Sequence, residues 1–103
     1  MFHYQITAGE NRSVIELTGD MDIDSSEIVK EQIIPESYPT KQVEINFAKV
    51  RFVDSTGIGL LIDLVNNLKK SDKEIAITNV SPGVQEVFSL LQLPDILGKE
   101  MFV

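Results

Sequence analysis

A strand pattern passes almost directly into a helix pattern over residues 42–70, and this constrains the fold more than any other feature. Val43, Ile45 and Phe47 alternate with polar residues, which is the two-residue period of a half-buried strand. Over residues 55–70 the apolar residues recur instead every three or four positions, as on a helix with one buried face. Because both elements must bury an apolar face, this unit predicts a sheet covered by helices.

The same two patterns alternate along the rest of the chain. We expect strands over residues 2–7, 14–18, 42–47 and 74–78, and a short last strand over residues 101–103. We expect helices over residues 24–33, 55–70 and 81–93. The first two strands are placed to form an antiparallel hairpin, and strands separated by helices pair in parallel through right-handed crossovers. We therefore predict a single α/β domain over residues 1–103, with a mixed β-sheet of four to five strands and about three α-helices.

Capping residues and prolines set the expected ends of the first and last helices. Asp24 or Ser25 can cap the first helix, and Glu27 is spaced from Asp24 for the reciprocal capping arrangement. Ser81 followed by a proline favours the start of the last helix, and we expect Pro94 to end it.

The charge and composition exclude several classes of function. The formal net charge is −7, with nine Lys and Arg residues against sixteen Asp and Glu residues. Nucleic-acid binding needs clustered cations, and a membrane span needs about 18 consecutive apolar residues, so we expect neither nucleic-acid binding nor stable membrane association. The absence of cysteine excludes disulfides and thiolate metal sites. The sequence has no signal-peptide pattern, so we expect a cytoplasmic domain. Its acidic charge favours contact with basic protein surfaces.

The acidic loop before the first helix does not predict a metal site. Asp20, Asp22 and Asp24 alternate as at the start of a calcium-binding loop, but the glycine and terminal glutamate of such a loop are missing. The single histidine, His3, lies near the N-terminus between two aromatic residues, and no catalytic triad can be built around it from the neighbouring sequence. We therefore expect no catalytic residue, no metal and no cofactor, and we interpret the chain as a protein that is not an enzyme.

The turn between the central strand and its helix holds more capping residues than a helix needs. Asp54, Ser55 and Thr56 are all capping types, although one side chain suffices to satisfy a free N–H at the helix start. Gly57 and Gly59 lower helix propensity by up to about 1 kcal/mol each relative to alanine. The glycines indicate either close packing of the helix on the sheet or the approach of another molecule to the backbone. We expect Val50, Phe52 and Val53 to anchor the chain just before this turn.

The apolar arc of the helix is wider than a surface helix needs. It covers about 200° when the residues are placed at 100° each, against a stripe of roughly 100°. Leu60 and Leu64 lie at one edge of the arc, near Gly57. Two interpretations are open: these leucines pack under a neighbouring helix, or they form an exposed apolar edge for a protein contact.

Two segments carry a resemblance to a known family. They are Gly19-Asp20-Met21-Asp22, similar to a G-E-L-D loop, and residues 43–61, VEINFAKVRFVDSTGIGLL, similar to a strand followed by D-S-[ST]-G-[LI]-G. Together, and in this order of strands and helices, they resemble the STAS domain family, and within it the bacterial anti-sigma factor antagonists. The resemblance covers nearly the whole chain.

The resemblance implies a mechanism of partner exchange in stress response or sporulation. Such a protein binds an anti-sigma factor that is also a serine kinase, which releases a sigma factor for transcription. The kinase uses ATP to phosphorylate the serine that follows the aspartate, here Ser55, and a serine phosphatase reverses the modification. Asp22 is then expected on the partner-binding surface.

The resemblance and the turn together define the expected site, and two other functions stay open. We expect the partner to contact Asp22, Asp54, Ser55, Thr56, Gly57, Ile58, Gly59, Leu60 and Leu64. The first alternative is an unphosphorylated STAS scaffold or a module that regulates transport. The second is a nucleotide or other small ligand held at the helix N-terminus, which the lack of lysine in the turn disfavours.

Overall fold

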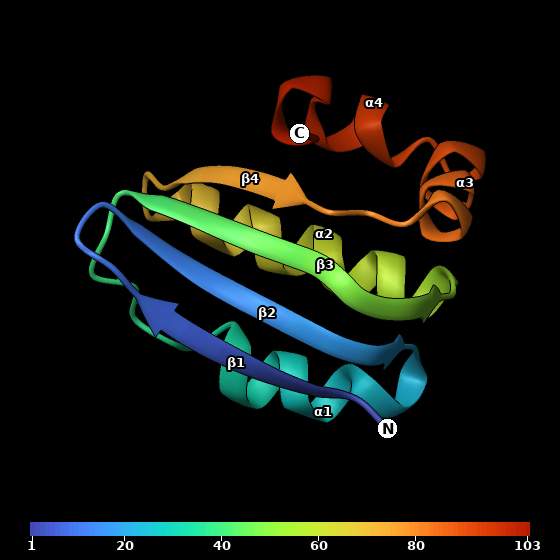
Figure 1. The fold of residues 1–103 in the computed structure, drawn as a ribbon, viewed down its shortest axis with the longest axis horizontal. Coiled ribbons are helices and arrows are strands. Elements are labelled where there is room, and N and C mark those ends of the chain that lie inside the picture. The colour runs from blue at the N-terminus through green and yellow to red at the C-terminus, as the bar shows by residue number, and fades with distance from the viewer.

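The computed structural model describes all residues from 1 to 103, and its centre is a four-stranded sheet in the order β1-β2-β3-β4. The strands are β1 (His3–Ala8), β2 (Arg12–Met21), β3 (Gln42–Val53) and β4 (Glu74–Thr78). β1 and β2 form an antiparallel hairpin, whereas β2, β3 and β4 are parallel to one another. This confirms the predicted mixed sheet and its hairpin (Figure 1).

The helices connect the parallel strands and extend the fold beyond the last one. They are α1 (Ser26–Ile28), α2 (Ser55–Lys70), α3 (Pro82–Leu90) and α4 (Leu93–Leu97). α1 lies between the 3-10 turn Ile23–Ser25 and the π-helical turn Val29–Ile33, and a further 3-10 turn covers Lys99–Met101. In Figure 1, α1 and α2 lie behind the sheet, while α3 and α4 lie beside edge strand β4. None of these helices has the length and apolar character needed to cross a bilayer.

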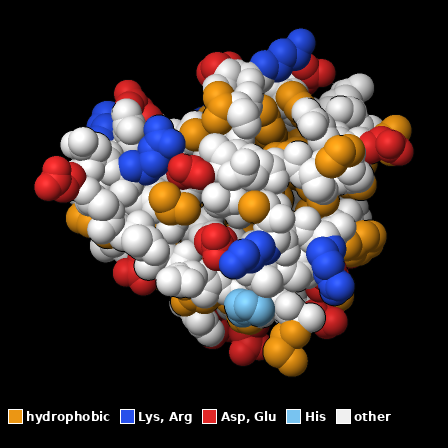
Figure 2. Space-filling model, viewed as in Figure 1, with side chains coloured by type: hydrophobic (Ala, Val, Ile, Leu, Met, Phe, Trp, Pro, Cys, Tyr) orange, Lys and Arg blue, Asp and Glu red, His pale blue; other side chains and the backbone are white.

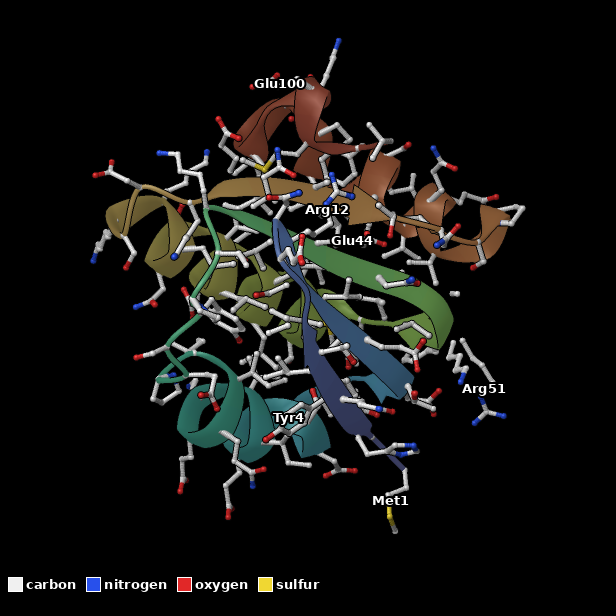
Figure 3. All side chains as sticks on the ribbon, turned by 60° about the vertical axis from the view of Figure 1, so that its left-hand side comes forward. Met1, Tyr4, Arg12, Glu44, Arg51 and Glu100 are labelled. Atoms are coloured by element: carbon white, nitrogen blue, oxygen red, sulfur yellow. The ribbon has the colours of Figure 1, made fainter.

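Buried apolar side chains lie between one face of the sheet and the helices. Ile15, Leu17, Ile45 and Phe47 are fully buried on this face, and they belong to a single core of 24 residues. The other face of the sheet carries polar side chains, including the ion pairs of Arg12 with Glu44 at 3.1 Å and of Lys49 with Glu16 at 3.3 Å. Figure 2 shows charges of both signs across this face, and Figure 3 shows Arg12 and Glu44 side by side. The uncovered face is therefore polar.

Two strands are longer than predicted because pairing across the sheet extends them. β2 continues to Met21 and β3 to Val53, and these two residues are partners in the parallel ladder. The register shifts twice along this pair of strands, between Glu16 and Thr18 and between Gly19 and Asp20. The first half of the expected acidic loop is therefore strand.

The C-terminal part also differs from the prediction. Pro94 does not end the last helix: α3 ends at Leu90, Gln92 adopts a left-handed conformation with φ of 56°, and α4 then contains Pro94 near its start. A proline is tolerated in the first turn because its missing N–H has no partner there. The expected last strand is reduced to one bridge, in which Phe102 pairs with Ile77.

Candidate functional site

The ends of β2 and β3 bring the acidic turn and the serine turn together. Met21 pairs with Val53, so Asp22 and Asp54 each directly follow a residue of the same cross-strand pair. The Asp54 N–H also donates to the Met21 carbonyl at 3.4 Å. The carboxyl ends of neighbouring parallel strands are the usual place for a site in an α/β sheet.

Asp54 alone caps α2. Its backbone is extended, and its Oδ1 accepts a hydrogen bond from the Gly57 N–H at 2.9 Å. Such a cap is worth about 1 kcal/mol. Thr56, which we expected to share this role, makes no capping hydrogen bond and is half-buried.

Ser55 is consequently left free. It is the first residue of α2, its side chain is exposed, and the hydroxyl has no hydrogen-bond partner within the protein. A hydroxyl in this place needs no rearrangement of the turn before another molecule can reach it.

The two glycines of α2 have different surroundings. Gly57 is buried, and a Cβ added there would overlap the backbone carbonyl of Met21 and lie 3.1 Å from Cγ1 of Val53. This confirms the close packing of the helix on the sheet. Gly59 is exposed, and a Cβ added there would meet nothing within 4 Å. The close-packing interpretation therefore does not hold for Gly59, and nothing inside the protein accounts for this glycine.

The acidic turn has its own cap, which is Asp22 rather than Asp24 or Ser25. Its Oδ1 accepts a hydrogen bond from the Asp24 N–H at 3.0 Å and begins the 3-10 turn. The Ser25 hydroxyl donates instead to the Asp22 carbonyl at 2.6 Å. Because β2 runs on to Met21, the helical region starts earlier than predicted and its cap moves with it.

The expected apolar edge of α2 is not at the surface. Ile58, Leu60 and Leu64 are 5%, 3% and 1% exposed and belong to the core, so the packing interpretation of Leu60 and Leu64 is the one that the structure confirms. These three side chains and the buried Gly57 do not reach a partner in this conformation. The residues of the expected site that remain accessible are Asp22, Asp54, Ser55, Thr56 and Gly59.

Two exposed apolar side chains near the turn were not predicted as site residues. Phe52, which we expected to anchor the chain, is 50% exposed, and Ile23 is 69% exposed. The adjacent pair Phe52-Val53 contained the signal, because consecutive residues of a strand point to opposite faces and only Val53 enters the core. The sequence gives no such signal for Ile23, because Met21 lies in the same segment of alternating acids and is fully buried.

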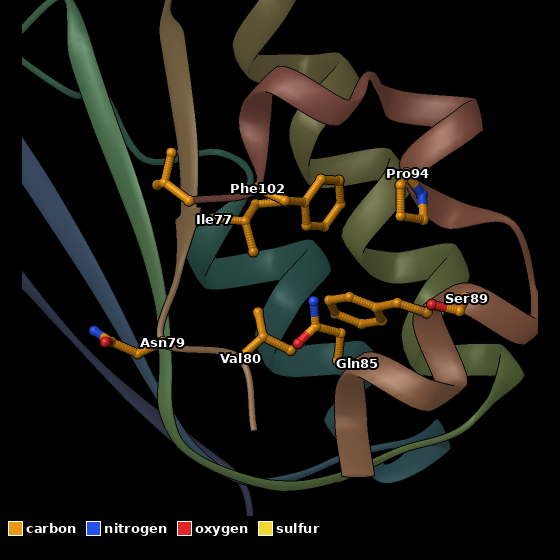
Figure 4. A pocket seen from close by; sticks show the side chains of 9 residues that line it. Ile77, Asn79, Val80, Gln85, Ser89, Pro94 and Phe102 are labelled. Carbon is orange, nitrogen blue, oxygen red and sulfur yellow. The ribbon is translucent and has the colours of Figure 1, made fainter. Parts of the chain in front are cut away.

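A recess of about 270 Å³ lies near the carboxyl end of β4, beside α3 and the C-terminal segment (Figure 4). Ile77, Phe88 and Phe102 form its apolar part, and Asn79 and Gln85 contribute amide groups. None of its lining residues is charged, so it offers no cation to a phosphate group. The recess thus lends no support to the nucleotide alternative.

Comparison with known proteins identifies the family. The family model described as "Mlab, STAS domain" matches residues 4–98. The chain belongs to the STAS domain family. The predicted resemblance and the STAS-like fold are therefore confirmed.

Individual STAS proteins show what this chain is similar to. It is 29% identical to the anti-sigma-B factor antagonist of Staphylococcus epidermidis over 84 residues, which cover 81% of this chain and 78% of that protein. SpoIIAA, an anti-sigma factor antagonist solved in unphosphorylated and phosphorylated forms, superposes with TM-scores of 0.65 and 0.67 at 24% and 22% identity. These matches cover 85% and 98% of this chain and 83% and 89% of those chains. A sulfate transporter family protein from Wolinella succinogenes gives a TM-score of 0.79 at 15% identity, covering 93% of this chain and 79% of that one. The structural likenesses show a shared fold.

Proposed function

We propose that this protein is an anti-sigma factor antagonist whose binding is switched by phosphorylation of Ser55. In this proposal it binds an anti-sigma factor that is also a serine kinase, and the sigma factor is released. The kinase transfers phosphate from ATP to Ser55 and the complex separates, until a serine phosphatase restores the hydroxyl. The observation that carries the proposal is the free, exposed Ser55 hydroxyl beside an Asp54 that already caps the helix.

The fold tolerates a phosphate on Ser55. The start of a helix has a partial positive charge and unpaired N–H groups, which favour an anion. The Gly57 N–H keeps its bond to Asp54, and the Ser55 side chain has no internal contact to lose. The switch therefore needs little internal rearrangement.

The same phosphate disfavours a protein contact at this surface. It adds a charge of about −1.5 to −2 next to Asp54 and across from Asp22. Arg51, the cation nearest in sequence, already pairs with Asp20 at 3.7 Å. Charge repulsion and added bulk in a close interface cost several kcal/mol, and each 1.4 kcal/mol changes the dissociation constant tenfold.

The accessible part of the site gives the contact residues of this proposal. Asp54 and Thr56 flank Ser55 in the sequence, Asp22 lies on the adjoining turn, and Gly59 lies about one helical turn further along α2. A glycine in a helix costs about 1 kcal/mol relative to alanine, and no neighbour within the protein requires one at position 59. Close approach of the partner to the bare backbone at Gly59 provides a reason for it.

The test uses the purified protein, its cognate anti-sigma kinase and Mg-ATP, with phosphate located by mass spectrometry. We expect one phosphate, on Ser55, and loss of kinase binding once it is added. Ser55→Ala should bind without being modified, and Ser55→Asp should bind at least tenfold more weakly. Ser71→Ala, at the exposed far end of the same helix, is the matched control and should behave as wild type. Phosphate on another residue, or a Ser55→Asp variant that binds as wild type does, would contradict the proposal.

An unphosphorylated STAS interaction module is the second candidate. It is favoured by a separate group of exposed apolar side chains in the C-terminal part of the chain, namely Leu90, Leu91, Ile96 and Val103. A stable assembly that forms equally well with Ser55→Asp would support this candidate over the first.

A further inference from the structure

The site contains apolar surface, but not where the helix pattern placed it. With Leu60 and Leu64 in the core, the large apolar side chains exposed next to the serine turn are Ile23 and Phe52. Phe52 precedes Ser55 by three residues on β3, and Ile23 begins the 3-10 turn that packs against α2. Both lie at the end of the sheet where Met21 and Val53 pair.

The two side chains face solvent from different elements. Phe52 pairs in register with Asp20, whose side chain is on the polar face of the sheet. Ile23 lies on the neighbouring turn, immediately after the cap Asp22. Figure 3 shows Arg51, the residue next to Phe52, projecting from this end of the sheet. The apolar side chains available to a partner near Ser55 therefore come from the end of β3 and from the 3-10 turn after β2.

The charges around these side chains are mostly negative. Asp20, Asp22, Asp24 and Asp54 belong to the two adjoining turns and strand ends, and Arg51 is the one cation among them. Arg51 is 3.7 Å from Asp20, so its charge is partly balanced already. A surface of complementary charge, with Lys or Arg around apolar recesses, fits this arrangement.

We propose that Ile23 and Phe52 are the apolar anchors of the partner contact and that they insert into recesses on a basic surface of the anti-sigma factor. This inference rests on the proposed function and adds the residues that supply the affinity. A few buried large side chains carry most of the binding energy of a protein interface, and the polar contacts around them exclude water. The carboxylates then speed association, and the anchors slow dissociation. In this proposal a phosphate on Ser55, three residues after Phe52 and at the start of the helix that contacts the 3-10 turn of Ile23, keeps both anchors out of their recesses.

The test measures the affinity of unphosphorylated protein for the anti-sigma factor by titration calorimetry, and the association and dissociation rates by surface plasmon resonance. Phe52→Ala and Ile23→Ala should each weaken binding at least tenfold, mainly through faster dissociation. Phe52→Thr should weaken it equally while keeping a residue that favours strands. Leu90→Ala is the matched control, because Leu90 is 75% exposed on α3, outside the proposed contact, and should change affinity less than twofold. Unfolding midpoints of all four variants should stay close to that of the wild type.

The outcomes separate this inference from the function on which it rests. If the wild type binds and is phosphorylated on Ser55, but the Ile23 and Phe52 variants bind as tightly as the wild type, the anchors are refuted and the proposed function stands. If Leu90→Ala weakens binding as much as they do, the contact lies elsewhere and the inference also fails. If the wild type does not bind the anti-sigma factor, both proposals are refuted.

Discussion

The two glycines of α2 should respond in opposite directions to the same substitution. In Gly57→Ala, the new methyl group overlaps the Met21 carbonyl oxygen and lies 2.8 Å from the carbonyl carbon. A backbone carbonyl in a sheet has no rotamer to escape into, so the end of β2 or the start of α2 must move. In Gly59→Ala, the methyl group points into open space.

The expected magnitudes follow from these contacts. Crowding of this kind costs about 1–3 kcal/mol, and movement of the helix start also weakens the Asp54 cap, worth about 1 kcal/mol. The alanine recovers about 0.5–1 kcal/mol of helix propensity in both variants. We therefore expect Gly57→Ala to lower the free energy of unfolding by about 2 kcal/mol and Gly59→Ala to raise it by about 0.5–1 kcal/mol.

Urea denaturation followed by circular dichroism measures both changes against the wild type. The midpoint should fall for Gly57→Ala and rise for Gly59→Ala, with the slope m unchanged if only stability is altered. In a domain of about 100 residues, 1 kcal/mol corresponds to about 4–8 °C in Tm. Equal shifts of the same sign, or a more stable Gly57→Ala variant, would refute the assignment of Gly57 to packing on Met21.

Three further substitutions test the core, the cap and a buried phenol. Leu64→Ala should cost about 2–5 kcal/mol of unfolding free energy because Leu64 is 1% exposed, whereas Leu90→Ala should cost less than about 0.5 kcal/mol; similar losses would place Leu64 outside the core. Asp54→Ala should cost about 1 kcal/mol and Asp54→Ser much less, since serine also caps; equal losses would argue against capping. Burial, helped by a nearby carboxylate, raises the pKa of Tyr38 above its ordinary value. The phenol therefore ionises more readily in the unfolded chain, so the contribution of Tyr38 to the free energy of unfolding is intact below about pH 10 and is lost as the pH rises further. The difference in unfolding free energy between wild type and Tyr38→Phe should therefore narrow above about pH 10, and a difference that stays constant or widens there would contradict this cause.

The helix α2 and the strand β4 could be predicted from the local sequence pattern alone. The local sequence pattern predicted α2 over residues 55–70 and β4 over residues 74–78, and the structure has these bounds. The ends of β2 and β3 could not be found in the same way. They are set by the pairing of Met21 with Val53, a contact between segments 32 positions apart, through two register shifts.

The serine turn at the centre of the site could be predicted from the sequence, but the apolar residues exposed around it could not. The crowding of capping residues at Asp54 and Ser55 is visible in the sequence, and the structure separates a cap from a free hydroxyl there. The margins depend on which edge of a wide apolar arc is covered, and this is decided by elements packed beside α2. Leu60 therefore lies in the core, and the exposed apolar side chains near the turn come from other elements, Phe52 from β3 and Ile23 from the 3-10 turn.

The Met21 carbonyl has a consequence for how fast such a switch can act. It accepts the Asp54 N–H and leaves no room beside Gly57, so the end of β2 and the start of α2 pack directly against each other. We therefore expect a change at Ser55 to need no slow internal rearrangement of this contact. If Ser55 is phosphorylated as proposed, the lifetime of each state is then set by the chemical bond to phosphate and by partner dissociation.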